Sequence, residues 1–176
     1  MVRLGWVLLL AIHIPAYSTE LKAGDPAPTF ALRSLNGEFF FLRDLCGQEL
    51  RSSSEHPKVV ILDFWATWCS PCLKTIPLIR RTVSLFDINE VALVLVSVDS
   101  LSATRRIPGI LGESIPHEIC VLDPYHVVME KYGLEKIPST FVISPEGKIH
   151  DVSGDDKRDR NAEEWLRAAI ERCLNK

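Results

Sequence analysis

The chain has 176 residues, of which 47% are hydrophobic, and this suits one globular domain with a sizeable core. Its formal net charge is -3, and charges of both signs are interspersed, so the composition offers no basic surface for nucleic acid. The sequence contains no internal repeat and no low-complexity segment.

Residues 1–20 differ in composition from the rest. Arg3 gives a short positive segment, residues 4–12 form an apolar run, and residues 16–18 (Ala-Tyr-Ser) place small side chains as at a signal-peptidase site. A membrane-spanning helix needs about 20 apolar residues, so this run is too short to be one. We therefore predict a cleaved signal peptide over residues 1–18, with an uncleaved N-terminal anchor as the alternative.

The first part of the domain predicts a hairpin, a loop and a strand. Two short apolar runs flank Asn36-Gly37, a strong turn signal, and indicate a β-hairpin within residues 24–45. Residues 46–58 are polar and indicate a loop. The β-branched run at 59–64 predicts a strand that is buried on both faces.

A helix is expected next, from Ser70 to Phe86. Its apolar residues recur three and four positions apart and form one stripe: Cys72, Ile76, Ile79, Val83 and Phe86. Pro77 lies inside this pattern, where it removes a backbone donor and should kink the helix.

The second part alternates strand and helix. Residues 91–98 predict a central parallel strand, whereas the prolines and glycines within 100–120 interrupt any helix there. Asp123-Pro124 is typical of a helix start, and a turn at 144–147 joins two antiparallel strands. A last helix is expected from about Asn161. The alternation predicts an α/β sandwich.

Two cysteines three positions apart stand in the stretch FWATWCSPCLKTIP, residues 64–77. Cysteine pairs at this spacing serve either metal binding or reversible disulfide chemistry. A structural zinc site needs four ligands, and the chain has no second such pair and no two histidines at ligand spacing. The spacing therefore favours redox chemistry, with no metal and no bound cofactor.

Cys69 lies just before the expected helix, where unpaired backbone N–H groups and the helix dipole favour an anion. A thiolate is stabilised there, which makes Cys69 the better nucleophile at neutral pH. Cys72, one turn further, is placed to attack a mixed disulfide at Cys69 and release the substrate. Pro71 suits a helix start, because the donor it lacks would be unused. Two packed, unreactive thiols are the alternative.

Asp63 interrupts the strand predicted at 59–64. It shares a side of that strand with Val59 and Ile61, so its side chain should point into packing. A buried carboxyl group holds its proton more tightly than an exposed one and can exchange it near neutral pH. Asp63 is thus a candidate to accept the proton of Cys72 as that thiol attacks, and a solvated, inert aspartate is the alternative.

Three segments together resemble the thioredoxin superfamily: GDPAPTFAL at 24–32, DFWATWCSPC at 63–72 and KIPSTFVISPEGKI at 136–149. The likeness is greatest to its exported thiol–disulfide oxidoreductases of the TlpA/ResA-like branch. This resemblance covers residues 24–176. It implies a thioredoxin-like three-layer sandwich, with a mixed central sheet, helices on both faces and an N-terminal β-hairpin.

The resemblance also implies roles for individual residues. By it Cys69 is the attacking cysteine, Cys72 is the resolving cysteine, and Asp63 is the buried aspartate of thioredoxins. Pro138 is expected to be a cis-proline that faces the disulfide, although only about 5–6% of X-Pro bonds in folded proteins are cis. The expected substrate-binding residues are Trp68, Ser70, Pro71, Ile137 and Pro138.

The chain departs from that branch at two residue positions and in the loop at 46–58, which is longer than usual and carries Cys46. Asp63 stands where the branch often has asparagine, and Thr75 stands where it usually has glutamate. The loss of that glutamate leaves the redox potential and the partner open. By resemblance to thioredoxin we expect a reductant of exported protein disulfides.

The expected domain at 24–176 is exported, is periplasmic if the source is bacterial, and is either soluble or tethered by an uncleaved N-terminal segment. Disulfides persist mainly in such oxidising compartments. Its partners would be protein thiols and disulfides, together with an upstream electron donor that is either membrane-bound or soluble, and no nucleic acid.

Two other functions are alternatives. Peroxiredoxins share the style of opening seen at 24–32, but Leu62 occupies the position where their cysteine motif requires proline. Copper-handling modules on this fold use a wider cysteine spacing and a distant histidine, for which the chain offers His117, His126 or His150.

Three cysteines lie outside the motif. Cys173 falls on the apolar face of the last helix and Cys120 in an apolar stretch, where thiols pack as small hydrophobes. Cys46 begins the polar loop and is expected to be reachable by solvent or by another thiol. The sequence favours three thiols outside the mechanism, with a structural bridge from Cys46 to Cys120 or Cys173 as the alternative.

Overall fold

The computed structural model describes residues 21–175 except 49, 51–55 and 154. The predicted signal segment, residues 1–18, lies outside the described residues, as does part of the loop predicted at 46–58.

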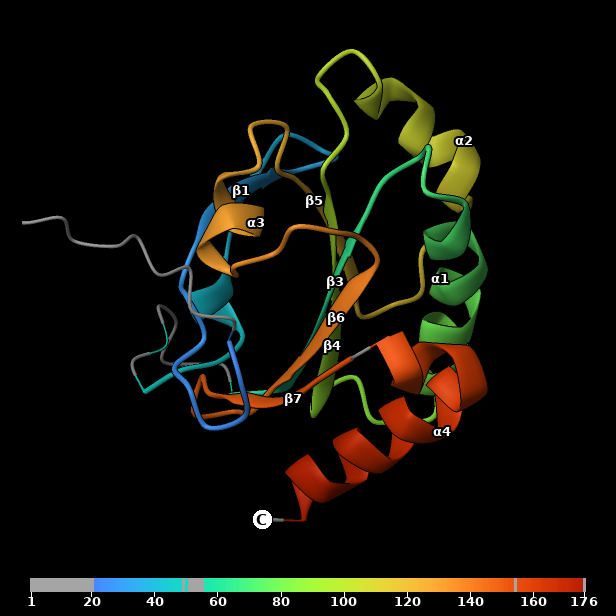
Figure 1. Cartoon of the computed structure of the whole chain (residues 1–176). Coiled ribbons are helices and arrows are strands. Elements are labelled where there is room, and N and C mark those ends of the chain that lie inside the picture. The colour runs from blue at the N-terminus through green and yellow to red at the C-terminus, as the bar shows by residue number, and fades with distance from the viewer. Residues whose placement is uncertain (1–20, 49, 51–55, 154, 176) are drawn as a thin grey trace, which may run out of the picture.

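A seven-stranded mixed sheet forms the middle layer, with the strand order β2-β1-β5-β4-β3-β6-β7 (Figure 1). Its centre is parallel: β4 (Val91–Ser97) pairs with β3 (Val59–Trp65) on one side and with β5 (Glu118–Leu122) on the other. Every residue of β3 and β4 is buried, because helices or loops cover both faces of the sheet. Both predicted central strands are confirmed.

Antiparallel hairpins complete the sheet at its two edges. The N-terminal hairpin joins β1 (Ala31–Ser34) to β2 (Phe39–Phe41) through the predicted turn at Gly37, whose φ of 86° suits glycine. The second hairpin joins β6 (Ser139–Ile143) to β7 (Ile149–Val152), and β6 runs antiparallel to β3.

Helices lie on both faces of the sheet, so the predicted three-layer, thioredoxin-like sandwich is confirmed (Figure 1). One face carries α1 (Ser70–Val83) and α4 (Asp155–Leu174), which pack against each other, and the other carries α3 (Val127–Lys131). Asn161 has non-helical backbone angles inside α4, so regular helix follows it, close to the predicted start. The shorter helical segments are η1 (Leu42–Asp44), η2 (Thr104–Arg106) and α2 (Ile107–Leu111).

Each face of the sheet has its own core. The predicted stripe of α1 is buried at Cys72, Ile76, Ile79 and Val83, although α1 ends at Val83 rather than at Phe86. On the α3 face the aromatic rings of Phe30, Phe64, Tyr132 and Phe141 pack at centroid distances from 5.0 to 6.4 Å.

No helix was assigned within residues 100–120, but the structure has a short one there, which the proline and glycine residues delimit instead of preventing. Helix α2 carries Pro108 in its first turn, where a proline loses no used donor, and ends at Gly112 with φ 63°. Strand β5 was not predicted, because it is short, begins with the charged Glu118 and has only Val121 fully buried.

The helix predicted from Asp123-Pro124 begins later, at Val127. His126 precedes it with φ 58°, a left-handed conformation that cannot continue a helix. Asp123 still caps α3, because its Oδ2 accepts the backbone N–H groups of Val128 and Met129, each at 2.9 Å.

Candidate active site

The two motif cysteines lie where β3 leads into α1. Cys69 and Cys72 form a disulfide, with Cα atoms 5.3 Å apart. Strand β3 ends at Trp65, and residues 66–68 connect it to Cys69 at the N-cap of α1. The strand thus places the pair at the end of the sheet where the carboxyl ends of the parallel strands meet, called the active-site edge below.

The start of α1 provides an environment that suits a sulfur anion at Cys69. The backbone of Cys69 is extended, and its Sγ accepts the backbone N–H of Cys72 at 3.2 Å. Pro71 stands in the first turn, where no helical partner exists for its position. Cys69 is 4% exposed and Cys72 is fully buried, so Cys69 is the more accessible sulfur of the pair.

A second segment reaches the same edge from β6. Antiparallel pairing sets Phe64 opposite Ser139, so Pro138 lies beside the end of β3. The Ile137–Pro138 bond is cis, and both residues are half-buried. Next to the pair in the sequence, Ser70 and Pro71 are exposed, and Trp68 is 66% exposed.

Asp63 lies within β3, two residues before the strand ends. Its side chain is fully buried, as strand alternation predicts, and its Oδ1 accepts the hydroxyl of Thr140 at 2.7 Å. Thr140 is its partner in the register of β6. Asp63 is therefore a structured carboxyl group under the active-site edge and not a solvated one.

Sequence analysis missed a second buried acid at this edge, Asp99, which follows β4. Its Oδ2 accepts the backbone N–H of Thr67 at 2.8 Å, and its Oδ1 accepts the Thr67 hydroxyl at 2.6 Å. The hydroxyl of Ser97 donates to Oδ2 at 2.9 Å. An acid directly after a buried parallel strand was the signal available in the sequence.

The remaining cysteines keep their thiols. The prediction that Cys46 is reachable was wrong: it is 2% exposed, because the η1 turn carries it inward and its backbone N–H bonds to Leu42. Burial raises the pKa of the Cys46 thiol to about 12. Burial likewise raises the pKa of the Cys120 thiol to about 12, and Cys173 is buried against α4's apolar neighbours.

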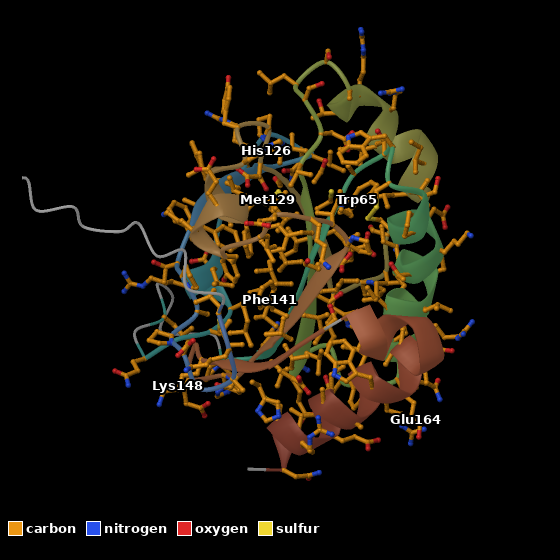
Figure 2. The ribbon with its side chains drawn as sticks, in the orientation of Figure 1. Trp65, His126, Met129, Phe141, Lys148 and Glu164 are labelled. Carbon is orange, nitrogen blue, oxygen red and sulfur yellow. A yellow bond between two sulfur atoms is a disulfide. The ribbon has the colours of Figure 1, made fainter. Side chains whose placement is uncertain are left out.

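Among the residues that the structure describes, no group of three or more His, Cys, Asp or Glu side chains is arranged to hold a metal ion. Of the histidines considered for copper, His126 lies beside α3, with Nε2 3.1 Å from the carbonyl oxygen of Val98 (Figure 2). No helix in the described part of the chain is both long and apolar enough to cross a membrane.

The fold and the cysteine pair define a class, the thiol–disulfide oxidoreductases of thioredoxin-like fold. The chain belongs to the AhpC/TSA family, which it matches over residues 23–152. It is 33% identical over 147 residues to the thiol-disulfide oxidoreductase ResA of Bacillus subtilis (strain 168), covering 83% of this chain and 74% of that one. ResA of Geobacillus kaustophilus (strain HTA426) is 28% identical over 153 residues, covering 83% and 80%.

Solved structures agree. The thioredoxin domain of a thiol-disulfide oxidoreductase from Bacteroides vulgatus is 25% identical, covers 85% of this chain and 99% of its own, and superposes with a TM-score of 0.64. A Chlorobium tepidum protein, a candidate thiol:disulfide interchange protein DsbE, is 27% identical, covers 85% and 99%, and gives a TM-score of 0.65. The chain is a thiol–disulfide oxidoreductase, and these relatives do not favour the peroxidase or copper-binding alternatives.

Proposed function

We propose that the protein reduces disulfides of exported proteins, with Cys69 as the attacking cysteine and Cys72 as the resolving one. The carrying observation is the N-cap position of Cys69, whose Sγ accepts the Cys72 N–H at the start of α1. The Cys69 thiolate attacks one substrate sulfur, and the other substrate sulfur leaves as a thiolate and takes up a proton. Cys72 then attacks the Cys69 sulfur of this mixed disulfide, and the substrate sulfur bound to Cys69 leaves as a thiolate. The Cys69–Cys72 disulfide has formed, and two electrons have passed to the substrate.

Asp63 accepts the Cys72 proton in this proposal. It is buried in the strand that leads to the pair, and Thr140 fixes its orientation. The exposed Trp68, Ser70 and Pro71 and the half-buried Ile137 and Pro138 form the surface that binds the substrate around its disulfide.

The same proposal includes compartment and electron supply. The predicted signal segment at 1–18 supports export, to the periplasm if the source is bacterial. A reductant in an oxidising compartment is consumed by each turnover. An upstream electron donor, either membrane-bound or soluble, must therefore restore the Cys69–Cys72 dithiol.

Trapping tests these roles. Cys72→Ser should leave mixed disulfides with substrate proteins at Cys69, whereas Cys69→Ser should trap none. The wild-type protein should reduce insulin disulfides, and Asp63→Asn should lengthen the life of the mixed disulfide while Thr140→Val, which keeps the carboxyl group, should do so less. Absence of Cys72→Ser adducts together with failure to reduce insulin would contradict the proposal.

A further inference from the structure

Asp99 connects the end of β4 to the loop that carries the active-site cysteines. Three donors converge on its two carboxyl oxygens: the backbone N–H and the hydroxyl of Thr67, and the hydroxyl of Ser97. The Asp99 side chain is fully buried. Asp99 thus links Ser97, on β4, to Thr67 in the segment that leads to Cys69.

The pattern of donors suits the ionised form of Asp99. The Thr67 N–H can only donate, and the two hydroxyls are aligned to donate as well. An ionised carboxylate only accepts, so all three bonds are satisfied without a proton on Asp99. Bonds of this kind, with an ionised acceptor, are stronger than those between neutral groups.

The Asp99 carboxyl group is held at Thr67, two positions before Cys69. Only Trp68 stands between them, so the Cα atoms of Thr67 and Cys69 are at most about 7 Å apart. Two other titratable groups lie near the end of β4. Burial above all raises the pKa of the Cys120 thiol on β5, and the Asp99 charge adds to that shift, whereas the His126 ring meets the carbonyl oxygen of Val98, the residue before Asp99. Figure 2 shows Trp65 on the α1 side of the sheet and His126 on the α3 side.

We propose that Asp99 is a positioning residue for disulfide exchange: it fixes the active-site loop at Thr67 and keeps a negative charge behind Cys69, which makes the pair more reducing. This inference goes beyond the roles proposed above and rests on the Cys69–Cys72 pair being the redox couple.

The sign follows from electrostatics. Reduction converts the disulfide into a dithiol, and at the helix start Cys69 then carries part of its population as thiolate. A nearby negative charge disfavours that thiolate and so destabilises the reduced form. Disulfide oxidoreductases whose reduced form is stabilised are oxidants, so destabilising the reduced form moves the couple toward a reductant.

Asp99→Asn tests the charge, because asparagine has nearly the same shape and can still accept the Thr67 N–H. The redox equilibrium of the purified full chain with glutathione is measured at mildly alkaline pH, together with thiolate formation followed by ultraviolet absorbance. We expect the equilibrium constant to move toward the dithiol by at least about threefold, or about 14 mV, with Cys69 ionising at lower pH.

Ser97→Ala gives the opposite prediction. It removes one donor to Asp99 and keeps the charge, so less of that charge is compensated and the equilibrium should move toward the disulfide. A purely structural role for Asp99 would make both variants loosen the loop and shift the couple in the same direction, which would overturn the proposal. If Asp99→Asn does not fold, the Ser97→Ala variant still tests the proposal. A redox equilibrium of its Cys69–Cys72 pair that is unchanged, or shifted toward the dithiol, would then overturn it.

Asp123→Asn is the matched control. Asp123 is also buried and accepts two N–H groups, but it caps α3 instead of holding the active-site loop. It should lower stability and leave the redox equilibrium within about threefold of wild type. If the wild-type Cys69–Cys72 pair does not behave as a single redox couple with glutathione, the proposed function is wrong. If it does, but Asp99→Asn leaves its equilibrium unchanged, only the role of Asp99 is wrong.

Discussion

At the scale of single residues, surroundings decide which thiols take part in exchange. Cys69 lies at a helix N-terminus and meets a backbone N–H, whereas Cys46 and Cys120 lie in packed surroundings that disfavour a thiolate. The pKa of the Cys46 thiol is raised from 9.0 to about 12. These surroundings support the proposed role of Cys69 as the attacking cysteine and favour neither Cys46 nor Cys120 for it.

The raised pKa of Cys46 predicts a loss of stability in alkali. A thiol with a folded pKa above its unfolded value stabilises the fold fully below pH 9.0, and that contribution is lost as pH rises toward about 12. Over this window the unfolding free energy should fall by up to about 1.4 kcal/mol per pH unit on account of Cys46. Cys46→Ala should remove that part of the slope in urea titrations.

The neutral-pH stability of Cys46→Ala serves as its own control, since it reports only the packing cost of the lost sulfur. Tyr132, whose pKa burial also raises, adds alkaline sensitivity of the same sign to both proteins. Equal slopes in wild type and variant above pH 9.0 would show that the Cys46 thiol does not titrate as proposed.

At the scale of elements, two adjacent arginines of α1 do different work. Arg80 binds both carboxylate oxygens of Glu118 on β5, at 2.6 Å each, and donates to the carbonyl oxygen of Leu111 at the end of α2 at 2.7 Å. The side chain of Glu118 is 2% exposed. Arg81 forms its ion pair with Glu163 of α4 where both side chains are well exposed, 62% and 39%.

Replacing each arginine by methionine should therefore have unequal effects. Arg80→Met leaves Glu118 as a buried charge without its partner, so we expect a loss of about 3 kcal/mol or more in the free energy of unfolding. Arg81→Met should have little effect, because exposed ion pairs are screened by water. Urea unfolding of both variants measures the difference, and equal losses would argue against Glu118 being held by Arg80.

Sequence patterns predict elements where burial is continuous and fail where contacts are long-range. The apolar runs of β3 and β4 identify them directly, since a strand covered on both faces has no polar side. Strand β5 escapes notice because Arg80, distant in the chain, neutralises the glutamate at its start. The polar sequence after Cys46 suggested exposure, but a tight turn before it sets its direction.

The same distinction applies to the site. The spacing of Cys69 and Cys72 is local and could be recognised from residues alone. Asp99 acquires its place only when β4 pairs with β3 and ends beside the loop at Thr67. No local pattern encodes that contact.

At the scale of the whole molecule, one sheet edge carries the chemistry. The pair follows β3, Asp99 follows β4, and Pro138 precedes β6, so three neighbouring strands deliver the site together (Figure 1). Because the pair is attached to a central strand of this sheet, its oxidation state and the stability of the fold are linked in a thermodynamic cycle.

That linkage gives a test of direction. In a reductant, the folded protein favours the disulfide over the dithiol more strongly than the unfolded chain does. The oxidised protein should therefore be more stable to unfolding than the reduced one. The difference amounts to about 1.4 kcal/mol for each 30 mV by which the native couple lies below that of the unfolded pair. Urea unfolding of the oxidised and reduced forms measures it. The double variant Cys69→Ser, Cys72→Ser should respond to no reductant and serves as the control. Greater stability of the reduced form would identify an oxidant and contradict the proposed direction, because in such proteins the dithiol is the state that folding stabilises.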